Sequence, residues 1–93
     1  MIKLPTGSKV KITVTNILGK GTCPAYLKVG DSWEVHSEIL PERFCSWAFQ
    51  SIYPFITVLR FGGSFPWGDK ENEISVCCPD PANPVVFRLE RFE

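Results

Sequence analysis

Four segments of the chain alternate apolar and polar residues with a period of two, which is typical of half-buried β-strands. In residues 9–17, valine and isoleucine occupy one face, and lysine and threonine occupy most of the other. The same alternation recurs in residues 32–36, 74–78 and 85–91. We therefore predict four strands, with Cys78 on the apolar face of the third strand and Cys77 on its opposite face.

Between the second and third predicted strands, apolar residues recur at the spacing of a helix. One face carries Phe44, Ala48, Ile52, Phe55, Ile56 and Leu59. Polar positions are few here, so most of the circumference of this helix should be covered. Pro54 cannot donate a hydrogen bond to the carbonyl of Gln50, and we expect it to kink the helix or split it in two. Gly62 and Gly63 should then end the helix, because glycine tolerates a positive φ.

The resulting element order is β-β-α-β-β, which predicts an α+β fold with an antiparallel sheet packed on one long, Pro-kinked, buried helix. The chain has 93 residues, the length of one domain, so we assign residues 1–93 to a single α+β domain. If the sheet leaves one face uncovered, we expect a homodimer, because large exposed apolar patches are uncommon on monomers.

Composition excludes several classes of protein. The apolar fraction is 44%, and ten Lys and Arg residues balance ten Asp and Glu residues, which is not the composition of a disordered chain. The absence of a basic excess argues against a nucleic-acid partner. The first residues hold no apolar run of signal-peptide length, and the most apolar stretch, residues 44–61, is too interrupted for a membrane span. We therefore expect a cytoplasmic protein with no membrane partner.

The four cysteines are the main candidates for chemistry. Without secretory context, free or metal-bound thiols are favoured over a disulfide framework. Cys23 lies in the long loop before the second strand, Cys45 at the start of the helix and Cys78 at the end of the third strand. If the fold brings these three together, they form a site for a thiophilic metal such as zinc, copper or iron. Their spacings of 22 and 33 residues match no local zinc motif, and the alternative is that they are small buried hydrophobes.

Two other functions are consistent with the same residues. In the first, Cys45 is the nucleophile of an enzyme, because a helix N-terminus favours a thiolate, and Cys23 or Cys78 resolves the product. His36 is the only histidine in the chain, so it is the only imidazole that could act as the base for Cys45. In the second, the cysteines only pack, and the aromatic segment 61–67 is the contact surface of an interaction module.

The carboxylates of Asp31, Asp69 and Asp80 lie in predicted turns. Aspartate commonly accepts hydrogen bonds from its own backbone in such turns, so we expect this role for all three. The aromatic residues of segment 61–67 either line a pocket near the helix end or cover the core.

A set of short segments extends over almost the whole chain, from about Lys11 to Leu89. They are Gly21-Thr-Cys-Pro-Ala, Lys28-Val-Gly-Asp, Cys45-Ser-Trp-Ala-Phe, Tyr53-Pro54, Leu59-Arg-Phe-Gly-Gly-Ser-Phe-Pro-Trp67 and Cys78-Pro-Asp-Pro followed by Pro84-Val-Val-Phe. Together they resemble a family of small prokaryotic proteins of about this length, common in anaerobes, that has no assigned activity.

The resemblance implies that the three cysteines of the family pattern fall on Cys23, Cys45 and Cys78, with Cys77 outside it. The chain departs from the pattern at Tyr26-Leu27, where the family commonly has Gly-His. It departs again at Ser46 and Gln50, where a proline and a histidine are common. The resemblance thus supports the cysteine trio without supplying a reaction.

Overall fold

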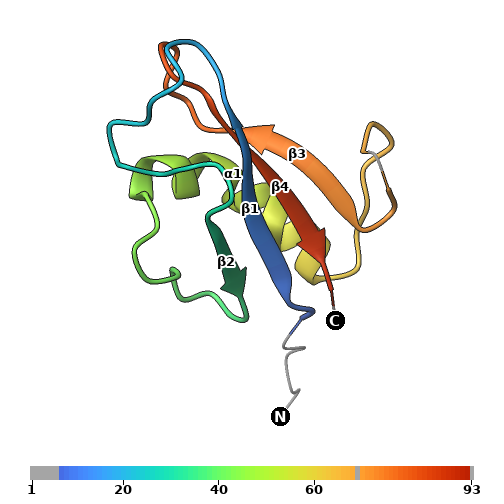
Figure 1. Ribbon diagram of the computed structural model, residues 1–93. Helices are drawn as coiled ribbons and strands as arrows, with labels where there is room; N and C mark the ends of the chain where they lie inside the picture. The colour runs from blue at the N-terminus through green and yellow to red at the C-terminus, as the bar shows by residue number, and fades with distance from the viewer. Residues whose placement is uncertain (1–6, 69, 93) are drawn as a thin grey trace.

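The computed structural model describes residues 7–68 and 70–92 and has the predicted α+β architecture (Figure 1). Four strands form one antiparallel sheet in the order β2-β1-β4-β3. The strands are β1 (Val10–Ile17), β2 (Ser32–Val35), β3 (Glu73–Cys77) and β4 (Val85–Arg91). The helix α1 (Ser46–Arg60) packs on one face of the sheet. The element order β-β-α-β-β is confirmed.

The core lies between the helix and the face of the sheet that the alternation marked as apolar. Val10, Ile12 and Val14 of β1 and Val85, Phe87 and Leu89 of β4 are buried on this face, and the buried positions of α1 lie opposite them. The largest fully buried side chains are those of Phe87, Ile12, Ile52, Ile56, Leu59, Ile74 and Leu89. At the end of β3, Cys78 is buried and Cys77 is exposed, which confirms the predicted faces of these neighbours.

The helix is continuous through Pro54 and is not split. Pro54 lies on the exposed side, together with Trp47, Gln50 and Val58. The carbonyl of Gln50, which Pro54 leaves without its helical donor, is therefore on the side that water reaches. Gly62 follows the helix with a φ of +88°, and its N–H donates to the carbonyl of Leu59, as expected for a helix end.

Two arginines hold the C-terminal end of the helix. Arg91 of β4 donates from Nη1 to the carbonyl oxygens of Leu59 and Gly63, both at 2.9 Å. Arg60 is itself buried and reaches Glu38 Oε1 at 3.0 Å. This hydrogen bond from Arg60 holds the pKa of the Glu38 carboxyl below its usual value. In the described part of the chain, no helix is long and apolar enough to cross a membrane.

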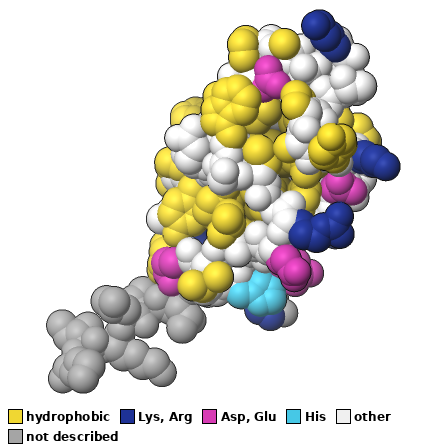
Figure 2. All heavy atoms as spheres, turned by 90° about the vertical axis from the view of Figure 1, so that its left-hand side faces the viewer, with side chains coloured by type: hydrophobic (Ala, Val, Ile, Leu, Met, Phe, Trp, Pro, Cys, Tyr) yellow, Lys and Arg dark blue, Asp and Glu magenta, His cyan; other side chains and the backbone are white. Residues whose placement is uncertain are grey.

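The second face of the sheet is not covered by the helix and is polar. It carries Lys11, Glu34, Arg88 and Glu90, with Arg88 Nε 2.9 Å from Glu90 Oε1. Exposed apolar side chains instead gather over the loops on the face shown in Figure 2, with charged residues mostly toward its edges. Among the described residues, the uncovered face of the sheet therefore offers no large apolar patch for the expected homodimer. The homodimer stays a prediction.

Replacing Arg91 tests whether its side chain fastens the helix to the sheet. We expect Arg91→Met to lower the free energy of unfolding by about 1–2 kcal/mol, because two carbonyls lose a charged donor. Arg88→Met, three residues earlier on the polar face, should cost about 0–1 kcal/mol, as surface ion pairs do. Urea unfolding of both variants measures the difference, and equal losses would contradict this role for Arg91.

Candidate functional site

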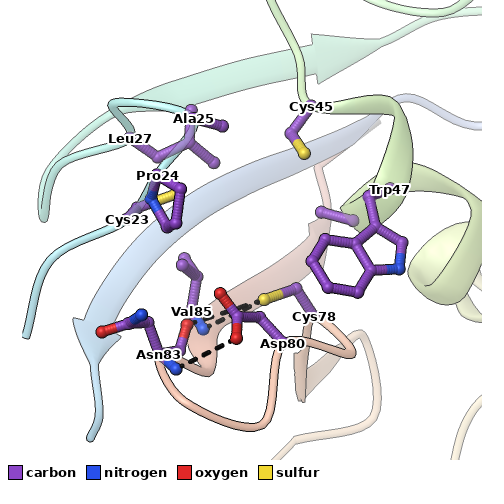
Figure 3. Close-up of a pocket in the computed structure, with 11 residues that line it drawn as sticks. Cys23, Pro24, Ala25, Leu27, Cys45, Trp47, Cys78, Asp80, Asn83 and Val85 are labelled. Carbon is purple, nitrogen blue, oxygen red and sulfur yellow. Dashed lines mark hydrogen bonds between the residues drawn. The ribbon is translucent and has the colours of Figure 1, made fainter. Parts of the chain in front are cut away.

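Cys23, Cys45 and Cys78 line a single pocket at the end of the sheet where β1 ends and β4 begins (Figure 3). They come from three separate segments: the loop after β1, the residue before α1 and the residue after β3. The rest of the pocket lining is Pro24, Ala25, Leu27, Trp47, Ala48, Asp80, Asn83 and Val85. The three cysteines that the sequence singled out therefore line one pocket.

Backbone pairing beyond the ends of the strands places the Cys23 loop beside the Cys78 loop. Leu18 N–H donates to the carbonyl oxygen of Pro84 at 2.9 Å, and Lys20 N–H donates to that of Ala82 at 3.2 Å. Gly19, between them, has a φ of +64°, and a Cβ there would overlap the carbonyl oxygen of Ala82. Only glycine permits this approach, so Gly19 sets the separation of the two loops.

The loop that carries Cys23 is anchored by Leu27, which is buried in the core. Cys23 itself is half-buried, and its carbonyl accepts a hydrogen bond from Tyr26 N–H at 2.9 Å. Tyr26 has a φ of +66°, a left-handed backbone conformation that residues other than glycine adopt at a cost in free energy. This turn directs Pro24 and Ala25 toward the pocket (Figure 3). Leu27 also lines it.

Cys45 is the N-cap residue of α1, as the sequence predicted for the start of the helix. Its backbone is extended, and its side chain makes no capping hydrogen bond. The carbonyl of Cys45 accepts the N–H of Phe49 at 2.9 Å, so the start of the helix is formed without the sulfur. The thiol is half-buried and lines the pocket together with Trp47 and Ala48 from the first turn.

Cys78 is the most firmly held of the three. Its Sγ accepts the backbone N–H of Val85 at 3.3 Å, and its thiol donates to the carbonyl oxygen of Asn83 at 3.9 Å. The backbones of Cys78 and Val85 are also joined, because Cys78 N–H donates to the Val85 carbonyl oxygen at 3.0 Å. Hydrogen bonds from N–H groups to sulfur are a common feature of metal–thiolate sites.

The remaining candidates lie elsewhere. All four cysteines are free thiols, and Cys77 is exposed on the polar side of the sheet. His36 is exposed as well, with Nε2 3.0 Å from Glu34 Oε1, and it is not among the residues that line the pocket. His36 therefore does not share the pocket with Cys45, as the base of a cysteine enzyme would.

The predicted turn aspartates behave as expected where the structure describes them. Asp31 accepts the N–H of Lys28, and Asp80 Oδ1 accepts the N–H groups of Ala82 and Asn83. Asp69 lies outside the described residues. In the aromatic segment, the ring of Phe65 lies between those of Phe55 and Trp67 in tilted contacts, with centroid distances of 5.6 and 5.3 Å.

The pocket is small and its walls are apolar. It encloses about 90 Å³, less than the roughly 300–1,000 Å³ of sites for drug-sized ligands. No Lys, Arg or His is among its lining residues. Asp80 is the one acidic residue in the lining, and one of its oxygens is already used in a turn. An ion or a very small molecule fits this volume, whereas a nucleotide or a peptide side chain with its backbone does not.

The donor set suits a soft ion, because three thiols and no imidazole favour thiophilic metals over magnesium or calcium. Across residues 7–68 and 70–92, no three Cys, His, Asp or Glu side chains are grouped as they would be around a metal. An ion would therefore have to draw the three sulfurs inward. Cys78 is fixed by its hydrogen bonds, so the Cys23 loop is the part that would move.

Comparison with protein-family models, with curated proteins and with solved structures finds no match to this chain.

Sequence reasoning did not find the walls of the pocket. Asn83 lies outside the segments that carry the resemblance, and Trp47, although it lies in the segment that begins with Cys45, had no assigned role. Asn83 is buried, and its Oδ1 has no hydrogen-bond partner among the described residues. The only signal in the sequence was the position of each cysteine at the boundary of an element.

Two glycines of the same loop provide a matched test of how the pocket is built. Gly19→Ala should lower the free energy of unfolding by about 2–4 kcal/mol, since it adds left-handed strain and an overlap with Ala82. Gly21 has a φ of +80° and open space around it, so Gly21→Ala should cost only about 1 kcal/mol. Urea unfolding and alkylation rates of Cys23 and Cys78 provide the readouts. Similar behaviour of both variants would show that Gly19 does not hold the loops together.

Proposed function

We propose that the protein binds a thiophilic metal or other soft ligand between Cys23, Cys45 and Cys78. The observation that carries this proposal is that three thiols from separate segments share one pocket. Cys77, the immediate neighbour of Cys78, faces the other side of the sheet and so serves as an internal contrast.

Packing alone is a weaker explanation for this arrangement. Protein interiors leave few voids larger than a water molecule, and buried cysteines that act as hydrophobes fill space. Here Cys23 and Cys45 are only half-buried, and the three cysteines, with eight further residues, line about 90 Å³ of open volume. Side chains that served packing alone would be expected to close this volume.

The three residues would contribute in different ways. Cys78 is a fixed ligand, because the N–H of Val85 donates to its sulfur, a hydrogen bond that persists when the thiol loses its proton to a ligand. Cys45 is positioned by the start of α1, and its thiol makes no capping hydrogen bond to the helix. Cys23 closes the site from the loop. We place this binding in the cytoplasm, where a reducing environment keeps thiols available.

The geometry supports binding better than nucleophilic catalysis. A catalytic cysteine needs a base within hydrogen-bond reach, and His36 contacts Glu34 instead. Asp80 is the only carboxylate in the lining, and it serves a turn. An interaction module that uses segment 61–67 would have no need for the cysteine pocket.

Cadmium is a suitable probe, because it is thiophilic and gives an ultraviolet charge-transfer band when bound by thiolates. We expect anaerobic protein to bind one Cd²⁺ per chain, and Cd²⁺ to slow alkylation of Cys23 and Cys45 by iodoacetamide. Chelation should restore both rates. Peptide mass spectrometry gives the rate for each residue.

The adjacent cysteines provide the control. Cys77→Ser should bind Cd²⁺ as the unsubstituted protein does, whereas Cys78→Ser should lose on the order of 100-fold in affinity, because the third linked ligand is gone. Circular dichroism checks that both variants fold. Equal effects of the two substitutions, or protection of Cys77, would refute the proposed site.

A further inference from the structure

We infer that the ligand class of this pocket is a trivalent metalloid, arsenic(III) or antimony(III), rather than a divalent metal ion. The inference rests on the proposed function, because it assumes that Cys23, Cys45 and Cys78 act together. It also requires the three sulfurs to move toward one another on binding, because no three such side chains are grouped around one point in the described part of the chain. The charge of the pocket and the number of its donors both favour a trivalent metalloid over zinc or copper(I).

Charge favours the trivalent ion. Three thiolates carry three negative charges, which a trivalent centre neutralises completely. Zinc with the same three thiolates leaves one negative charge, and copper(I) leaves two. The lining contains no Lys, Arg or His to offset that charge, and its side chains are mainly apolar. A net charge in such surroundings is unfavourable, so the neutral complex is preferred.

The number of donors points to the same class. Zinc in proteins is almost always four-coordinate, and a structural site would need a fourth protein ligand. Asp80 is the only further acidic or imidazole side chain in the lining, and its use would make the complex more negative. Arsenic(III) and antimony(III) form three bonds to sulfur and carry a lone pair, so they need no fourth donor. The lone pair can face the apolar wall that Leu27, Ala48 and Val85 provide.

The binding step is a ligand exchange with no change in oxidation state. Arsenous acid has three As–O bonds, and three As–S bonds replace them. Each departing hydroxide takes the proton of one thiol and leaves as water, so three waters form and no net proton is released. Zinc, in contrast, releases one proton to solvent for each thiolate it binds. An apolar pocket that disfavours free thiolates therefore disfavours zinc more than arsenous acid.

The test is a competition on the whole chain. Anaerobic protein near neutral pH receives one equivalent each of sodium arsenite and Zn²⁺, and after desalting both elements are measured per chain. We expect close to one arsenic per chain, little zinc, and the loss of three titratable thiols. Retention of zinc in place of arsenic would overturn the choice of metalloid while leaving the proposed function intact. Retention of neither element, together with no Cd²⁺ binding, would overturn both.

Cysteine variants identify the binding site of the arsenic. Each of Cys23→Ser, Cys45→Ser and Cys78→Ser should weaken arsenite binding on the order of 100-fold, because the third linkage is lost. Cys77→Ser should leave it unchanged. If Cys23→Ser or Cys45→Ser, both at half-buried positions, keeps full affinity, the three-sulfur site is wrong. A measured release of protons on arsenite binding would also contradict the neutral complex.

Discussion

The close approach of two backbone segments, at Gly19 and at Ala82, is what the pocket depends on. β1 and β4 are neighbours in the middle of the sheet, and their pairing continues past the strand ends through the bonds from Leu18 and Lys20. A side chain at position 19 would collide with the carbonyl of Ala82, so the approach requires glycine. Without it, the Cys23 loop would have no fixed position relative to Cys78.

The helix completes what the sheet begins. The core residues Ala48 and Ile52 seat α1 on the sheet, and this seating brings the N-cap residue Cys45 over the end where the two loops meet (Figure 3). At the other end of the helix, Arg91 ties its last carbonyls to β4. The pocket is therefore a consequence of how the helix and the two central strands are joined, and each cysteine is held by a different element.

The strands could be predicted because their alternation is local, and the helix because its apolar face is regular. The meeting of the cysteines could not be predicted. Separations of 22 and 33 residues carry no geometric information until the strand order β2-β1-β4-β3 is known. The sequence likewise left open whether Pro54 kinks the helix or splits it. The structure shows that Pro54 lies on the exposed side of a helix that stays continuous. The free side of the sheet is polar, which the alternation did imply.

Chemical cross-linking tests most directly whether the three thiols share one pocket. The Cys77→Ser protein is treated with dibromobimane, a short reagent that fluoresces when both of its arms have reacted with thiols, and the products are mapped by mass spectrometry. We predict cross-links within one chain between members of the trio Cys23, Cys45 and Cys78. Products attached at one thiol only, or cross-links only between chains, would contradict the shared pocket.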